Sequence, residues 1–127
     1  MGVRIIIAVA LLGIYGCGST TSAPTTTTTQ TGGSSPNVTG TPVSIVRGSS
    51  VLTTTAYSPN PVTVAVGGSV TWVNNDTVTH TSSANGGTWN SGAIAPGGAF
   101  TMTFATAGTY PYHCTIHPGM TGTVTVQ

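Results

Sequence analysis

Three side chains with electron-rich donor atoms lie within one short stretch near the C-terminal end of this sequence. Cys114 is followed three residues later by His117 and three residues after that by Met120. A thiolate, an imidazole and a thioether so close together make a soft, compact set of metal ligands. With one more imidazole, the set becomes two histidines and a cysteine in a trigonal arrangement with a weak axial methionine, which is typical of a mononuclear type 1 (blue) copper site.

The second imidazole has to come from one of the two other histidines, His80 and His113. Tyr112 and Cys114 lie two residues apart in a stretch that alternates like a β-strand, so they share a face. His113 lies between them and therefore points to the opposite side. His80 remains as the second histidine ligand, and it would close the site across the fold.

Each of these residues has an ordinary alternative role when taken alone. A single Cys114 is most often a small buried hydrophobe, and an isolated methionine often fills a core. Zinc is the main rival metal, but it prefers four firm ligands or three and a water, and methionine is a poor zinc ligand. A Cys-His nucleophile pair is less favoured, since no orienting acid or oxyanion motif is evident and Asp76 is the only carboxylate side chain.

The elements that must position these residues are short β-strands. Alternating apolar residues with a period of two recur along the chain, separated by turns rich in glycine, proline and asparagine. The positions that we expect to share a face are Val62, Val64 and Val66; Val70 and Trp72; Phe100, Met102 and Phe104; Tyr110, Tyr112 and Cys114; and Val124 and Val126. Strands at such spacing predict an all-β domain, a sandwich or a barrel.

Charge is almost absent from the 127 residues. The charged side chains are Arg4, Arg47 and Asp76, and without the N-terminal segment the last two cancel. A basic surface for nucleic acid and an acidic docking surface are therefore both excluded. A partner would have to be recognised through shape, apolar contact and hydrogen bonds.

The N-terminal part of the sequence is expected to direct the protein out of the cytoplasm. Residues 1–16 predict a signal peptide, with Arg4 before a short apolar run. Ile14-Tyr15-Gly16-Cys17 resembles a lipobox, although Tyr15 is unusual there, and it predicts a lipid on Cys17. The alternative is an ordinary signal peptide with Cys17 as an incidental thiol. We expect a lipid anchor on a prokaryotic membrane, at the periplasm or the cell surface.

The segment 17–41 is rich in serine, threonine, glycine and proline. It carries too few apolar side chains to offset the entropy of ordering, which predicts a disordered tether. The globular domain should therefore comprise residues 42–127. Cys114 is the only cysteine after Cys17, so no disulfide can form within that domain.

Several motifs of this domain together resemble the cupredoxins, the small blue copper proteins of the plastocyanin, pseudoazurin and amicyanin group. These motifs are residues 61–76, Ser91-Gly92, Pro96-Gly97, and residues 104–114 followed by the short ligand loop. The resemblance covers residues 43–127. It implies a Greek-key β-sandwich of seven or eight strands, with copper near one end.

The resemblance also implies a role for each site residue. Cys114 would be the strong thiolate ligand, His80 and His117 would complete the trigonal plane, and Met120 would be the weak axial ligand. The ring edge of His117 would be exposed within an apolar patch. The residues expected to form this patch are Pro59, Pro61, Ala95, Pro118 and Gly119.

Two residues depart from the pattern of the family. Thr81 stands where these proteins often have an asparagine that ties the two ligand loops together. A hydroxyl cannot copy the reach of the amide, so we expect a looser connection. Ile116 stands where amicyanin-like loops usually have proline, and its free N–H could donate to the sulfur of Cys114. On this hypothesis Ile116→Pro lowers the reduction potential.

The predicted function is that of a one-electron carrier in which copper alternates between Cu(I) and Cu(II), not that of an enzyme. We expect a monomer that meets larger redox proteins or membrane redox complexes through the patch around His117. Copper delivery or storage is the alternative. A delivery site needs exchangeable ligands and extra methionine or histidine, whereas only Met102 is left over here. Met120 in the axial place argues against a redox enzyme with an open copper position.

Overall fold

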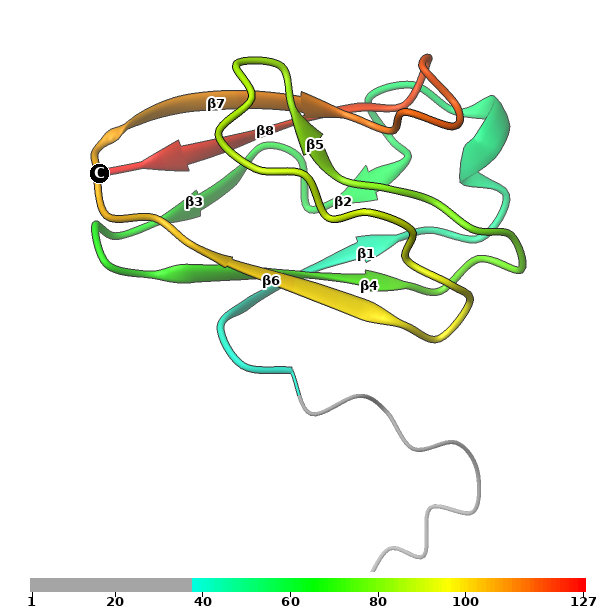
Figure 1. The fold of residues 1–127 in the computed structure, drawn as a ribbon, viewed down its shortest axis with the longest axis horizontal. Coiled ribbons are helices and arrows are strands. Elements are labelled where there is room, and N and C mark those ends of the chain that lie inside the picture. The colour runs from blue at the N-terminus through cyan, green and yellow to red at the C-terminus, as the bar shows by residue number, and fades with distance from the viewer. Residues whose placement is uncertain (1–37) are drawn as a thin grey trace, which may run out of the picture. The chain divides into compact units, whose positions relative to one another are not determined.

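A computed structural model describes residues 38–127 and folds them into two four-stranded β-sheets (Figure 1). The first sheet has the order β2-β1-β4-β6 and the second the order β3-β8-β7-β5. The strands of the first sheet are β1 (Thr41–Ile45), β2 (Tyr57–Ser58), β4 (Ser69–Asn74) and β6 (Ala99–Thr103). Those of the second are β3 (Val62–Val64), β5 (Ser83–Ala84), β7 (Gly108–His113) and β8 (Thr121–Val126). The predicted signal peptide and Cys17 lie outside the described residues, as does the tether up to residue 37.

The eight strands confirm the predicted all-β sandwich. Two pairs, β1 with β4 and β3 with β8, are parallel, and the remaining pairs are antiparallel. Parallel neighbours need long crossover connections, so the chain passes repeatedly between the two sheets. The 3-10 turn η1 (Ser49–Val51) is the one helical segment between residues 38 and 127. No helix of these residues is long and apolar enough to span a membrane.

The core lies between the two sheets and follows the predicted alternation. Val70 and Trp72 of β4 are fully buried, as are Tyr112 of β7 and Val124 of β8. Trp72 lies at the centre, with its ring 5.3 Å from that of Tyr112 and 5.6 Å from that of Trp89. Aromatic side chains bury large apolar surfaces, and this cluster anchors the fold in the absence of a disulfide.

One expected core position was wrong. Val66 does not share the buried face of Val62 and Val64 but is 52% exposed. Strand β3 ends at Val64, and a tight turn follows in which the N–H of Gly68 donates to the carbonyl of Ala65. The alternation of buried and exposed side chains holds only while the backbone stays extended. The turn ends the extended backbone, so the side chain of Val66 is exposed to solvent.

The packing of Tyr112 depends on a glycine in the neighbouring strand. Gly122 of β8 lies opposite Tyr112 in the register of β7 and β8. A Cβ atom at Gly122 would lie 2.3 Å from a ring carbon of Tyr112, far closer than van der Waals contact. The absence of a side chain at Gly122 therefore leaves the space that the ring of Tyr112 occupies.

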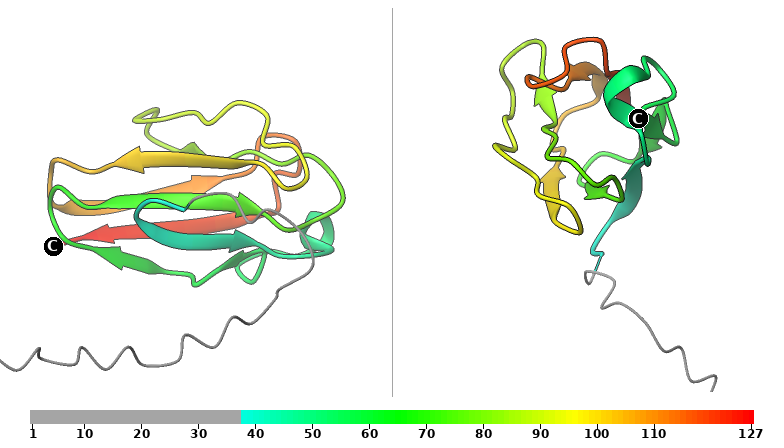
Figure 2. Two further views of the ribbon diagram at one scale, coloured as in Figure 1. Left: turned by 90° about the horizontal axis from the view of Figure 1, so that it is seen from below. Right: turned by 90° about the vertical axis from the view of Figure 1, so that its right-hand side faces the viewer.

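The strands bring three connections to one end of the sandwich (Figure 1 and the right view of Figure 2). These are residues 46–56 after β1, residues 75–82 after β4, and residues 114–120 after β7. The pairing of β1 with β4 runs from Thr41 beside Val70 to Ile45 beside Asn74. Thr41 and the C-terminus therefore lie toward the opposite end of the domain (Figure 1).

Candidate metal centre

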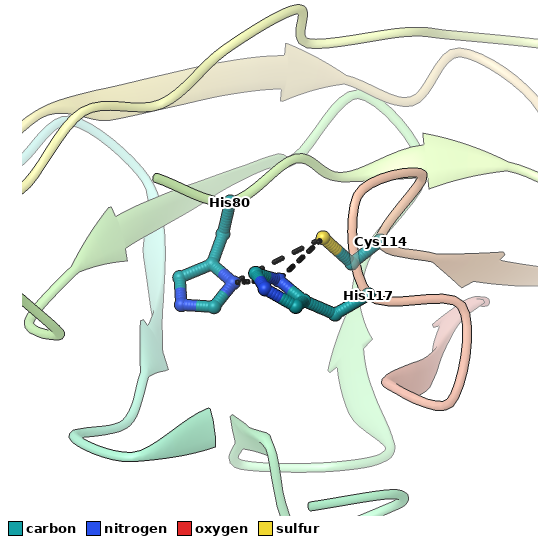
Figure 3. A group of neighbouring side chains, drawn as sticks. All are labelled: His80, Cys114 and His117. Carbon is teal, nitrogen blue, oxygen red and sulfur yellow. Dashed lines mark hydrogen bonds between the residues drawn. The ribbon is translucent and has the colours of Figure 1, made fainter. Parts of the chain in front are cut away.

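Three of the predicted ligands meet at this end with their donor atoms facing one another (Figure 3). The Sγ atom of Cys114 lies 3.9 Å from Nδ1 of His80 and 3.9 Å from Nδ1 of His117. The two Nδ1 atoms are 3.2 Å apart. His80 and Cys114 are fully buried, while His117 is partly exposed.

The size of this donor triangle fits a single metal ion. A point equidistant from three atoms separated by 3.9, 3.9 and 3.2 Å lies about 2.1 Å from each of them. Bonds from a metal such as zinc to imidazole nitrogen and thiolate sulfur are about 2.0 to 2.3 Å long. Two imidazoles and one thiolate in a trigonal array are the donors that copper takes in blue copper sites.

The ligand loop after β7 also brings Met120 to the site. The loop is closed by two backbone hydrogen bonds, from the N–H of Met120 to the carbonyl of His117 (2.9 Å) and from the N–H of Cys114 to the carbonyl of Met120 (3.1 Å). The side chain of Met120 is fully buried. A buried thioether beside the cysteine suits a weak axial ligand.

His113 lies outside the cluster, as strand parity predicts. Its Nδ1 atom lies 2.6 Å from Oδ1 of Asn85, on the outer side of the sheet. The metal-ligating group found among residues 38–127 consists of His80, Cys114 and His117.

The backbone of His80 is fixed by a short bridge to the segment before β6. Its N–H donates to the carbonyl of Ile94 (3.2 Å) and its carbonyl accepts from the N–H of Ile94 (2.8 Å). On the side of the ring away from the site, Nε2 lies 2.9 Å from Oδ2 of Asp76 and 3.0 Å from Oγ of Ser49. The imidazole is therefore held at both ends, with Nδ1 aimed at Cys114.

Asp76 orients His80, although no orienting acid is evident from the sequence. The single side-chain carboxylate of the chain contacts the His80 ring. The hydrogen bond from the N–H of Gly48, and after it the His80 ring, hold the pKa of the Asp76 carboxyl well below its usual range. Asp76 lies four residues before His80 and is the only carboxylate side chain of the chain. This proximity was the one sign in the sequence that Asp76 could contact His80.

Thr81 connects the two ligand loops through its hydroxyl. Its Oγ1 accepts a hydrogen bond from the N–H of Thr115 (2.8 Å) and lies 3.1 Å from Oγ1 of Thr115. The backbone N–H of Thr81 donates to Sγ of Cys114 (3.3 Å). The backbones approach closely enough that a short hydroxyl side chain is sufficient.

The hydrogen bond expected from Ile116 to the sulfur is not formed. Among residues 38–127, the backbone donor to Sγ of Cys114 is the N–H of Thr81, and the N–H of Ile116 makes no such bond. The side chain of Ile116 is 49% exposed. Ile116 therefore belongs to the surface of the site and not to the hydrogen bonding of the sulfur.

Tyr57 contacts Thr81, the residue whose N–H donates to the sulfur of Cys114. Its hydroxyl donates to the carbonyl of Thr81 at 2.6 Å, and its ring packs edge-on against Tyr112. Burial, and after it the neighbouring Cys114, raises the pKa of Tyr57 well above its usual range, so the phenol stays neutral and remains a donor. The sequence gives no sign of this role, because nothing in the local pattern around Tyr57 indicates contact with Thr81.

The loops at the end of the domain that carries His117 have exposed apolar residues. Ile116, Pro118 and Gly119 are exposed, as are Val51 of η1 (86%) and Val78 (42%). The predicted patch residues Pro59, Pro61 and Ala95 are exposed as well. Val51 and Val78 were not expected, since the sequence does not show that η1 lies at the same end as the ligand loop.

Comparison with known proteins agrees with this geometry. Residues 46–127 match the copper binding proteins of the plastocyanin/azurin family. The chain is 37% identical to the amicyanin of Paracoccus denitrificans over 76 residues, covering 56% of this chain but only 58% of that protein. It is 39% identical to the plastocyanin of Scenedesmus fuscus over 84 residues, covering 56% of this chain and 86% of that protein.

Solved structures show the same likeness. A purple cupredoxin from Nitrosopumilus maritimus superposes with a TM-score of 0.64 at 33% identity, covering 68% of this chain and 99% of that one. A reduced Cu(I) form of an amicyanin variant gives a TM-score of 0.61 at 30% identity, covering 72% of this chain and 87% of that one. A match over most of the domain, together with a matching donor set, indicates copper as the metal of this site.

Proposed function

Because this chain belongs to the plastocyanin/azurin family of copper-binding proteins, we propose that it carries single electrons on one type 1 copper ion. The proposed ligands are His80, Cys114, His117 and Met120. The observation that carries the proposal is the donor triangle of His80, Cys114 and His117. Buried, hydrogen-bonded residues at this end of the domain hold the triangle in place.

When copper is bound, it supplies a Cu(II)/Cu(I) couple at this position. The chain contributes by holding the donor atoms in one arrangement. His80 is fixed through Asp76 and Ile94, and Cys114 is fixed through the N–H of Thr81. A site that is rigid in this way needs little rearrangement when its charge changes, which suits rapid gain and loss of an electron.

We place electron entry and exit at the exposed edge of His117. Ile116 and Pro118 of the same loop are exposed, and so are Val51 and Val78 in the two other loops at this end of the domain. In the near absence of charged side chains, partners would dock through apolar contact, with little electrostatic steering. Larger redox proteins or membrane redox complexes are the proposed partners.

The proposed location is outside the cytoplasm, on a lipid attached to Cys17 and a tether of residues 17–41. Strand β1 begins at Thr41, toward the end of the domain opposite the ligand loops. A tether that enters there would leave the face around His117 free to meet a partner.

The proposed function is tested by loading the purified protein with Cu(II) and recording visible absorption, EPR and the reduction potential. An intense charge-transfer band with narrow copper hyperfine splitting is expected, and Cys114→Ser should abolish the band. A colourless or redox-silent metal site in the wild-type protein would contradict the proposal.

Copper delivery or storage is distinguished by the rate of metal loss to a chelator. His80, Cys114 and Met120 are fully buried, so we expect slow release. Rapid exchange of copper would favour delivery over electron transfer.

A further inference from the structure

We infer that Asp76 is a positioning residue of the metal centre, which fixes the ring of His80 and favours the oxidised state through its buried negative charge. The inference rests on the proposed function, because it concerns the same copper site. It assigns a role to the single side-chain carboxylate of the chain.

The carboxylate of Asp76 lies in a cradle of hydrogen-bond donors. Oδ1 accepts from the N–H of Gly48 (3.0 Å) and of Thr77 (2.7 Å). Oδ2 accepts from the N–H of Ser49 (3.1 Å) and from its hydroxyl (3.2 Å). These bonds connect the loop after β1 with the loop after β4, and they hold the carboxylate in one orientation. They also satisfy a carboxylate that is largely buried, since Asp76 is only 6% exposed.

This cradle determines which nitrogen of His80 can bind a metal. A carboxylate only accepts hydrogen bonds, so Nε2 of His80, 2.9 Å from Oδ2, has to carry the hydrogen. A neutral imidazole then has its lone pair on Nδ1, the atom that faces Cys114 and His117. Such carboxylate–histidine–metal arrangements orient the ring and make the ligand a stronger base.

The charge of Asp76 has no partner other than the metal site. In the part of the chain that the structure describes, the other charged side chain is Arg47, which is exposed, and the contact with His80 is the only ion-pair contact. A buried charge is screened less than a surface charge. A negative charge beside a ligand stabilises Cu(II) more than Cu(I), because Cu(II) carries the larger positive charge.

The test is Asp76→Asn, which keeps the shape of the side chain and removes its charge. We expect the affinity for Cu(II) to fall about 10- to 100-fold, as for other residues that support a metal ligand. The affinity for Cu(I) should fall less. Each tenfold difference between the two losses corresponds to a potential about 59 mV higher for a one-electron couple.

A control variant separates the buried charge beside the site from a charge elsewhere on the domain. Arg47→Gln removes an exposed charge, and it should shift the ratio of the two affinities by less than threefold. Equal losses of Cu(I) and Cu(II) affinity in a folded, blue Asp76→Asn protein would overturn the inference.

A second measurement avoids dependence on the folding of the variant. The ¹⁵N chemical shifts of the His80 ring in the metal-free wild-type protein should show hydrogen on Nε2 and a lone pair on Nδ1. The opposite tautomer would overturn the inference. If the wild-type protein lacks the charge-transfer band, the proposed function fails instead, and the two failures are therefore distinguishable.

Discussion

The connection between the two ligand loops through Thr81 can be tested by removing one oxygen atom. Thr81→Val keeps the shape of the buried side chain but leaves the N–H of Thr115 without the acceptor that it has at 2.8 Å. A typical hydrogen bond contributes about 0.5 to 1.5 kcal/mol net, and this one is partly buried. We therefore expect the free energy of unfolding to fall by about 1 kcal/mol.

A matched control comes from the other side of the same contact. Thr115→Val removes only the contact between the two hydroxyl oxygens at 3.1 Å and keeps the bond from its own N–H to Thr81. Thr115 is exposed, so water can solvate what remains of its side chain. The loss in Thr115→Val should therefore be smaller, about 0.5 kcal/mol or less.

The assay is thermal and urea unfolding of both variants in the metal-free and copper-loaded states. For a domain of this size, a loss of 1 kcal/mol lowers Tm by about 4 to 8 °C. Equal losses of stability in Thr81→Val and Thr115→Val would refute the claim that the bond from the N–H of Thr115 connects the two loops. An unchanged Tm in Thr81→Val would show that this bond does not stabilise the domain.

Three further results are expected. Gly122→Ala should lower the free energy of unfolding by about 3 kcal/mol, because the added Cβ would lie 2.3 Å from the ring of Tyr112. Gly86→Ala is the control, since Gly86 has open space around it, and it should leave the unfolding curve nearly unchanged. Similar unfolding curves for the two variants would disprove the close packing of Gly122 against Tyr112. Ile116→Pro should alter the reduction potential by less than about 59 mV, since its N–H does not reach the sulfur; a larger fall measured by voltammetry would restore the original hypothesis. Free copper at about 1,000 times Kd should stabilise the protein by about 4 kcal/mol, and calorimetry of Cys114→Ser should show this gain largely lost.

Thr81 connects the sulfur of Cys114 with the second ligand loop and with the aromatic core. Thr81 contributes its backbone N–H to the sulfur, its hydroxyl to the opposite loop and its carbonyl to Tyr57. One residue next to His80 therefore connects the ligand, the second loop and the aromatic core. A substitution that moves the backbone of Thr81 should disturb all three contacts together.

The class of fold and three of the four proposed ligands follow from local patterns in the sequence. The spacing of Cys114, His117 and Met120 is local, so their proximity follows from a short loop in any folded state. The period-two alternation around Trp72 and Tyr112 likewise reflects a rule of extended chains. It failed at Val66, where a turn ends the extended backbone.

The surroundings of the ligands depend on the three-dimensional fold and could not be predicted from the sequence. Asp76 reaches Ser49 across 27 residues, and Thr81 reaches Thr115 across 34. Serine and threonine are common in this chain, and nothing in their local pattern distinguishes the few that meet at the site. Their roles arise because the strands carry separate loops to one end of the sandwich, where a hydrogen bond depends on tenths of an ångström that sequence spacing does not specify.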